Sequence, residues 1–209
     1  PMTTPHPLAE LQSSLYDLSA LHTDLTESFD AVIVGSGAGG AVLAKELAEG
    51  GMRVALVEEG GLHLEHTELA VHSFAAKYRN AGLFNTFGNP MIAVPLGRCL
   101  GGATTINSGT CFPTPPHILE RWRGEFNLTD IRQDSMDRAF RRVEKQLQVA
   151  PADFRVMSRS NTMIHEFLAE EGEAGAPLRR NAPSCEGCGM CFYGCTSHAK
   201  QSMDCSYLP

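Results

Sequence analysis

Three glycines between residues 35 and 40 have the spacing at which a backbone can bind phosphate. Gly35, Gly37 and Gly40 fill the positions of a G-x-G-x-x-G pattern. This pattern permits a tight turn, a close approach to a pyrophosphate and tight helix–strand packing. Glu58 follows at the end of the next apolar run, where a carboxylate would accept hydrogen bonds from the ribose hydroxyls of an adenosine. Together these residues are typical of a dinucleotide-binding site.

The segments around these glycines predict the elements that would position such a site. Residues Ala31–Val34 form an apolar, β-branched run typical of a strand buried on both faces of a parallel sheet. A helix should follow, with Leu43 and Leu47 on the face that packs against the sheet, and its N-terminus would direct free N–H groups and its dipole at phosphate. Residues Val54–Val57 predict the second strand. The alternative is a structural strand–helix–strand turn without a ligand, but the full context favours the cofactor.

A second segment rich in glycine and small residues covers residues 95–112. Small side chains and backbone amides let a chain lie close to a flat or anionic group. Arg98 has the geometry for phosphate, and Asn107 offers both a donor and an acceptor. The alternative interpretation is an ordinary loop within an extended region.

Four cysteines, Cys185, Cys188, Cys191 and Cys195, have the spacing of the bacterial ferredoxin run that binds an iron–sulfur cluster. In two-cluster ferredoxins the fourth cysteine serves the other cluster, and this chain has no second run. A single cluster would therefore need Cys195 to bend back or Cys205 to contribute. A four-cysteine zinc site and structural cysteines, reduced or disulfide-paired, are the other two interpretations that stay open.

Composition narrows the class of protein. The 209 residues are 43% hydrophobic and 20% charged, which suits one soluble globular domain or one and a half. The net charge of -7 argues against nucleic acid as a partner. No apolar run has the length of a transmembrane segment and the N-terminus lacks a secretory pattern, so a cytoplasmic location is the expectation.

Helices are predicted in four further places. Leucines from Leu8 to Leu25 recur close to a helical period, which predicts an amphipathic helix that packs before the first strand. Shorter patterns predict helices at His117–Arg123, Ile131–Leu147 and Asn161–Glu171.

Three segments of the chain together resemble the glucose-methanol-choline (GMC) oxidoreductases, flavoproteins that oxidise alcohols. They are GSGAGG at residues 35–40, GRCLGGATTINSGT at 97–110, and the closing segment CEGCGMCFYGCTSHAKQSMDCSYLP. The likeness is closest to bacterial members with a cysteine-rich segment. It implies an α/β, Rossmann-like FAD-binding fold of the GMC type that is incomplete in this chain. The expected parts are an N-terminal helical extension (1–28), an FAD-binding domain (29–150), and a helical, cysteine-rich segment (151–209) leading into a substrate domain.

The resemblance also assigns cofactor contacts. The pyrophosphate would lie at the first glycine segment and the adenosine ribose at Glu58, while the second segment would line the flavin phosphate, ribityl chain and ring. Ala103 departs from the Ser, Thr or Gly usual at its position, and Ile106 stands where some relatives attach the flavin through a histidine, so non-covalent FAD is expected. The predicted FAD-binding residues are Gly35, Ser36, Gly37, Ala38, Gly39, Gly40, Glu58, Arg98, Gly102, Ala103, Asn107, Ser108 and Thr110.

The reaction that the resemblance implies is the oxidation of a CH–OH group in an alcohol, sterol or sugar, with hydride transfer to the flavin. None of the eight histidines lies in a motif that matches the family's catalytic base, which is therefore expected C-terminal to Pro209. The expected partners are a small-molecule alcohol and an electron acceptor, either a protein or a quinone. A flavin/iron–sulfur electron-transfer subunit and a non-catalytic fragment are the alternatives.

Overall fold

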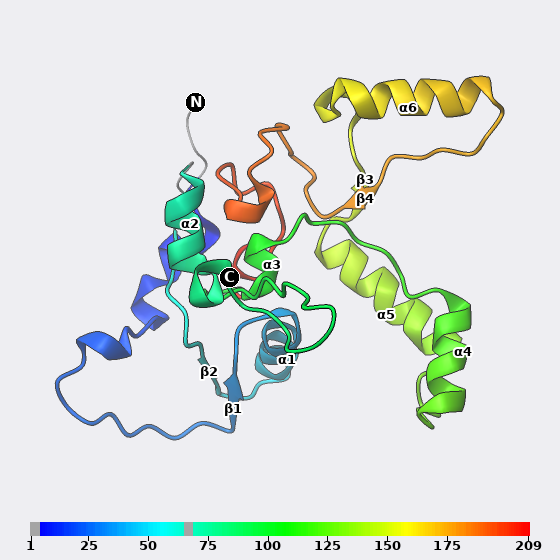
Figure 1. Ribbon diagram of the computed structural model, residues 1–209. Coiled ribbons are helices and arrows are strands. Elements are labelled where there is room, and N and C mark those ends of the chain that lie inside the picture. Colours follow the sequence, from blue (N-terminus) through cyan, green and yellow to red (C-terminus); the bar gives the residue numbers. More distant parts are fainter. Residues whose placement is uncertain (1–4, 65–68) are drawn as a thin grey trace. The chain divides into compact units, whose positions relative to one another are not determined.

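The computed structural model describes residues 5–64 and 69–209, with only the backbone described at residues 10–13, and it divides into two compact units (Figure 1). Unit 1 comprises residues 1–109 and 188–209, and unit 2 comprises residues 110–187. The domains expected from the sequence, with boundaries at residues 28 and 150, stay a prediction. The C-terminal segment belongs to unit 1 because it packs against early elements of that unit, including α1 (Ala38–Glu49).

The centre of unit 1 is the strand–helix–strand unit that the sequence predicts. Strand β1 (Ala31–Val34) pairs in parallel with β2 (Val54–Val57), with Ala31 opposite Val54, and α1 connects them. All three elements lie at the expected positions. A short apolar strand followed by glycines and then by helix-forming residues fixes this local structure with little help from the rest of the chain.

The packing of this unit differs from the expectation in two ways. Only Ile33 of β1 is buried, whereas Val34 is 85% exposed, so the prediction of a strand buried on both faces is wrong for this chain. The described residues form a sheet of two strands here, and a single helix covers one of its faces. Helix α1 buries Ala41 and Ala44, and Leu43 is 49% exposed, because the small alanines allow the closest approach to the sheet.

The predicted N-terminal amphipathic helix is also wrong. Two 3₁₀ helices replace it, η1 (Pro7–Ser14) and η2 (Leu18–Ala20). Asp17 accepts hydrogen bonds from the backbone N and the Oγ of Ser19 at 2.9 and 2.6 Å, and such local bonds compete with a continuous helix. Leu8 is buried, whereas Leu15, Leu18 and Leu21 are exposed, as is Leu25 beyond them; the side chain of Leu11 lies outside the described residues.

The rest of unit 1 surrounds the second glycine segment. In chain order its elements are α2 (Ala70–Lys77), η3 (Arg79–Gly82), α3 (Ala103–Ile106), η5 (Cys191–Tyr193) and α7 (Met203–Ser206). The C-terminal elements contact early ones: η5 packs on α2 and α3, and α7 packs on η1, α1 and α3. The cysteine-rich segment therefore lies against the glycine segment that precedes it by some eighty residues in the sequence.

Unit 2 contains the three later helices that the sequence predicts, within a few residues of their expected bounds. Its elements are α4 (Pro116–Glu125), α5 (Gln133–Gln146), β3 (Ala150–Pro151), η4 (Phe154–Val156), α6 (Arg159–Glu170) and β4 (Arg179–Arg180). Strands β3 and β4 pair antiparallel, and Arg179 donates to both carboxylate oxygens of Glu144 at 2.6 and 2.9 Å, which ties β4 to α5. Across the described part of the chain, every helix is too short or too polar to cross a membrane.

Candidate cofactor site

The first glycine segment forms a turn that only glycine can adopt at two positions. Gly35 has a φ of +92°, in the region that favours glycine, and its N–H donates to the Val57 carbonyl at 2.7 Å. A Cβ on Gly40 would lie 1.8 Å from the carbonyl oxygen of Gly35. The turn itself therefore requires glycine at Gly35 and Gly40, two of the three positions of the pattern.

The N-terminus of α1 faces solvent at this turn. Its N-cap is Gly37, which supplies no side-chain hydrogen bond, and Ala38 and Gly39 are exposed. The first amides of a helix have no partner within the helix, and the helix dipole adds partial positive charge there. An anion can therefore bind at this end of α1 without a basic side chain.

Ser36 has a different place from the one expected of a cofactor contact. It is fully buried, and its backbone N and its Oγ both donate to Glu58 Oε2, at 2.9 and 2.6 Å. The N–H of Gly60 donates to Glu58 Oε1 at 2.8 Å. Three of about four acceptor positions of the carboxylate are thus occupied, which leaves capacity for one more donor such as a hydroxyl group. Ser36 holds Glu58 in position and does not itself face the site.

The second glycine segment packs directly on the first. The N–H of Gly101 donates to Ser36 Oγ at 2.9 Å, and a Cβ on Gly102 would lie 3.0 Å from Gly37 Cα. A Cβ on Gly60 would lie 2.3 Å from the backbone at Arg98 and Cys99. Two segments about sixty residues apart in the sequence therefore meet backbone to backbone, at a spacing that side chains would prevent.

The remaining predicted residues lie on α3 or within a few residues of its ends. Ala103 begins this helix and is exposed, and Asn107 Oδ1 accepts a hydrogen bond from the N–H of Gly109 at 3.0 Å, so its side chain braces the loop that contains Ser108. Arg98 is exposed, with its Nε 3.7 Å from an oxygen of Glu59. Thr110 belongs to unit 2, where it bridges to Arg180. Apart from Thr110, the predicted cofactor residues all belong to unit 1.

Lys200 is a residue of this region that sequence reasoning missed. Its side chain is 1% exposed, and its Nζ donates to the carbonyl oxygens of Thr105, Asn107 and Cys191 at 2.9, 2.7 and 3.0 Å. Burial lowers the pKa of Lys200 to about 8. Lys200 lies in the closing segment that carries the family resemblance, but only the tertiary structure shows that it is buried and which carbonyls it binds.

The three cysteines of the run that belong to unit 1, Cys188, Cys191 and Cys195, do not form a group of closely placed ligand atoms within the described residues. Cys185 belongs to unit 2 and the others to unit 1, where the Sγ of Cys195 lies 3.4 Å from the backbone N of Lys200. The space beside the turn at residues 191–193 is taken by the buried ammonium groups of Lys77 and Lys200, which bind backbone carbonyls. The iron–sulfur interpretation has no support.

A different group in the described chain, His6, His198 and Cys205, does bring three ligand-type atoms within 4.8 Å of one another. His6 Nδ1 accepts the N–H of Leu8 at 3.1 Å, so the ring proton lies on Nε2, which donates to Asp204 Oδ2 at 3.2 Å. Burial, and secondly the Asp204 charge, raise the pKa of Cys205 to about 12. In this structure His6 thus links the N-terminal segment to Asp204 of α7 through hydrogen bonds.

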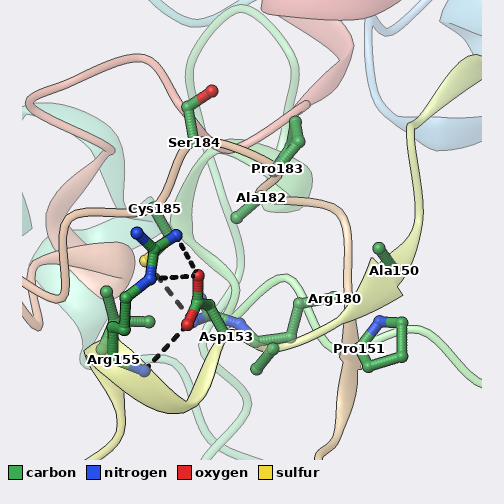
Figure 2. A pocket seen from close by; sticks show the side chains of 11 residues that line it. Ala150, Pro151, Asp153, Arg155, Arg180, Ala182, Pro183, Ser184 and Cys185 are labelled. Carbon is green, nitrogen blue, oxygen red and sulfur yellow. Dashed lines mark hydrogen bonds and ion pairs between the residues drawn. The ribbon is translucent and has the colours of Figure 1, made fainter.

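Unit 2 contains a cavity of about 370 Å³. Figure 2 shows the side chains that line it. Asp153 and Arg155 form an ion pair beside it, with Arg155 Nε donating to Asp153 Oδ2 at 2.8 Å, and Arg180 Nη1 lies 3.9 Å from Cys185 Sγ. Cys185 is the one predicted site residue that lines it, and the lining contains no histidine. No residue of the two glycine segments lines this cavity.

Comparison with known proteins identifies this pairing of glycine segments. Residues 30–209 match the family described as GMC oxidoreductase. The chain belongs to the GMC oxidoreductase family. It is 39% identical over 195 residues to a GMC-type oxidoreductase of Mycobacterium tuberculosis, covering 92% of this chain and 31% of that protein. It is 30% identical to a long-chain-alcohol oxidase of Arabidopsis thaliana, covering 86% of this chain and 24% of the relative.

A cholesterol oxidase of Acinetobacter baumannii is 25% identical to this GMC chain, over 86% of this chain and 38% of that enzyme. Among solved structures, formate oxidase of Aspergillus oryzae matches with a TM-score of 0.36 and 23% identity, over 47% of this chain and 20% of that chain. The chain thus spans about a third or less of the length of the first relatives named above. The predicted family and the predicted α/β, Rossmann-like fold class are confirmed.

Proposed function

We propose that this chain forms the FAD-binding part of an oxidoreductase that acts on CH–OH groups and holds FAD without a covalent bond. The observation that carries this proposal is the convergence of the two glycine segments on Ser36 and Glu58. A lone glycine turn would suit NAD as well as FAD. A second backbone segment packed against the first supplies an extended surface for the longer, flavin-containing cofactor.

The residues of the site fit this cofactor. The solvent-facing amides at the start of α1 suit the pyrophosphate, and the remaining acceptor capacity of Glu58 suits a ribose hydroxyl. Ala103, Asn107 and Ser108 would line the flavin part, as would Arg98 and Thr110. Ile106 is buried and has no group that could form a bond to the flavin. When bound, FAD supplies the acceptor for a hydride, and the residues of this chain bind and orient it.

The substrate class rests on the family. The long-chain-alcohol oxidase and the cholesterol oxidase named above support an alcohol or a sterol as substrate, and a sugar is the third candidate. The catalytic base of this reaction is proposed to lie C-terminal to Pro209. The electron acceptor is proposed to be a protein or a quinone. The electron-transfer subunit is the weaker alternative, because Cys188, Cys191 and Cys195 of unit 1 form no group of closely placed ligand atoms within the described residues.

Two measurements on the purified protein test this proposal. Titration with FAD should quench flavin fluorescence with saturation, and acid precipitation should release all of the flavin into the supernatant. A protein that binds no FAD contradicts the proposed function, and a yellow pellet contradicts the non-covalent attachment. An assay of the complete enzyme with a long-chain alcohol, a sterol and a sugar, using a dye as electron acceptor, should show oxidation of at least one of them.

A further inference from the structure

The ammonium group of Lys200 has a complete set of partners, all of them backbone carbonyls. An ammonium carries three N–H donors, and three carbonyl oxygens accept from it at 2.7 to 3.0 Å. The side chain is 1% exposed and, within the described residues, forms no ion pair. Burying a charge without hydrogen bonds is costly, so losing any of these three bonds would destabilise the folded state. The bonds therefore hold the three backbone carbonyls close to the ammonium group.

Two of these carbonyls belong to the second glycine segment. The oxygens of Thr105 and Asn107 lie in the peptide groups that join those residues to Ile106 and Ser108. Because a peptide group is planar, fixing its carbonyl fixes the direction of the whole unit. Lys200 therefore sets the course of the backbone through Asn107 and Ser108, and its third bond ties this loop to Cys191 in the cysteine-rich segment.

We propose that Lys200 is a positioning residue of the cofactor site, which holds the loop at Asn107 and Ser108 in place for the flavin and adds a buried positive charge behind it. This inference rests on the proposed function, since it takes the loop to line the flavin part of FAD. In this inference the cysteine-rich segment serves to place Lys200 against the loop and need not bind a metal.

Lys77 provides a matched comparison within the same unit. It is also buried, at 2% exposure, and its Nζ donates to the carbonyl of Tyr193 at 2.6 Å and lies 3.4 Å from Ser73 Oγ. These contacts fix the same cysteine-rich turn but involve no atom of the second glycine segment. A Lys77→Met variant therefore removes a second buried ammonium group by the same substitution, without removing a hydrogen bond to the loop at Asn107.

Protonation offers a second way to probe the same contacts. The groups that face Lys200 are Asp204 and the thiols of Cys191, Cys195 and Cys205, while burial is the largest influence and lowers the pKa of Lys200 to about 8. Above this pH the amine has two N–H donors for three carbonyls, so one bond is lost. The Cys191→Ser and Cys195→Ser variants serve to separate the lysine titration from that of the nearest thiols.

The test uses the complete FAD-loaded enzyme and compares the wild-type protein with Lys200→Met and Lys77→Met. In the wild type, the flavin midpoint potential should show a pH-dependent step near 8 in addition to the proton uptake of the flavin itself. This step should persist in Lys77→Met and in both serine variants but vanish in Lys200→Met. The Lys200→Met variant should also have a lower potential, because a nearby positive charge favours the reduced flavin, and should bind FAD about tenfold more weakly.

The outcomes separate the two proposals. Wild-type protein that binds no FAD contradicts the proposed function itself. FAD binding with the same potential and the same pH profile in Lys200→Met as in the wild type overturns the role of Lys200 alone. If Lys200→Met fails to fold, the wild-type profile decides: the step near 8, kept in both serine variants, supports the inference, and its absence from the wild type overturns it.

Discussion

A single buried hydroxyl joins the two glycine segments of this protein. Ser36 Oγ donates to Glu58 Oε2 at 2.6 Å and accepts the N–H of Gly101 at 2.9 Å. The hydroxyl is suited to this place because it donates one hydrogen bond and accepts another at the same time. Its contribution to a cofactor site is thus indirect, through the position of Glu58 and of the second segment.

Replacing Ser36 with alanine should reduce the free energy of unfolding by about 1–3 kcal/mol, because the N–H of Gly101 loses its acceptor in a buried place. The affinity for FAD should fall as well, since Glu58 loses one of its donors. Chemical denaturation and FAD titration measure the two effects. Ser28→Ala, at an exposed serine, is the control and should change neither. Equal stability of the two variants would contradict the bridging role of Ser36.

The lowered pKa of Lys200 predicts how this residue influences stability as the pH changes. Its pKa is 10.5 in the unfolded chain and about 8 in the folded protein, so between these values the unfolded state binds more protons. The contribution of Lys200 to the free energy of unfolding should therefore be least favourable below pH 8 and should rise as the pH increases toward 10.5. Chemical denaturation of the wild type and of Lys200→Met across this pH range measures this contribution. The free energy of unfolding of the wild type, relative to that of the variant, should increase with pH. A difference independent of pH would disprove the shift.

At the scale of elements, the turn between β1 and α1 determines whether the site can form. The helix begins directly at the glycines, and its first turn lies against the carbonyl of Gly35. Of the glycines in this segment, Gly40 tolerates no side chain, whereas a Cβ on Gly39 would meet nothing within 4 Å. Alanine variants at these two adjacent positions therefore test whether the segment needs glycine because a side chain at Gly40 would clash, or only because glycine makes the backbone flexible.

Gly40→Ala should abolish FAD binding and destabilise the protein by about 3 kcal/mol or more, because the added methyl group overlaps a backbone carbonyl and α1 must move. Gly39→Ala should unfold at the same or a slightly higher denaturant concentration, since alanine favours a helix over glycine by about 1 kcal/mol. Denaturant midpoints and flavin absorbance of the purified variants provide the comparison. Retention of FAD by Gly40→Ala would refute the turn geometry.

At the scale of the whole molecule, both units expose apolar side chains. The face of the β1–β2 sheet shows Val32, Val34 and Val57 at 43–85% exposure, and α6 of unit 2 shows Met163, Ile164 and Phe167 at 56–58%. A strand rich in β-branched residues is typical of a sheet that is covered on both faces. Contiguous apolar patches on soluble proteins usually mark a surface that binds another surface.

The chain prepared by itself should consequently self-associate through the exposed sheet face. A double variant, Val32→Thr with Val34→Thr, should shift the population toward monomer because it replaces two exposed methyl groups with hydroxyls. Sedimentation velocity over a range of protein concentrations would report this shift. Val71→Thr, at an exposed valine on α2, is the matched control and should leave association unchanged. A wild-type chain that is monomeric at all concentrations would contradict the prediction.

Local features of this fold were predictable from the sequence because they depend on neighbours along the chain. The glycine turn, β1, α1 and β2 follow from residue types and spacing, and the three helices of unit 2 follow from their apolar periodicity. The leucine pattern near the N-terminus failed because local hydrogen bonds at Asp17 and the lack of a partner surface outweighed its periodicity. The iron–sulfur interpretation of the cysteine spacing has no support, and a sequence run does not by itself determine where sulfur atoms lie.

The sequence by itself determined the two glycine segments and Glu58, since glycine is the residue that a left-handed turn and close backbone contacts require. Only the tertiary structure decided that Ser36 is buried under the site and that Lys200 lies behind the loop at Asn107. These placements arise from contacts between segments far apart in the chain, such as Gly101 on Ser36 and Lys200 on Thr105. Long-range packing sets such contacts, and no local pattern of residue types records them.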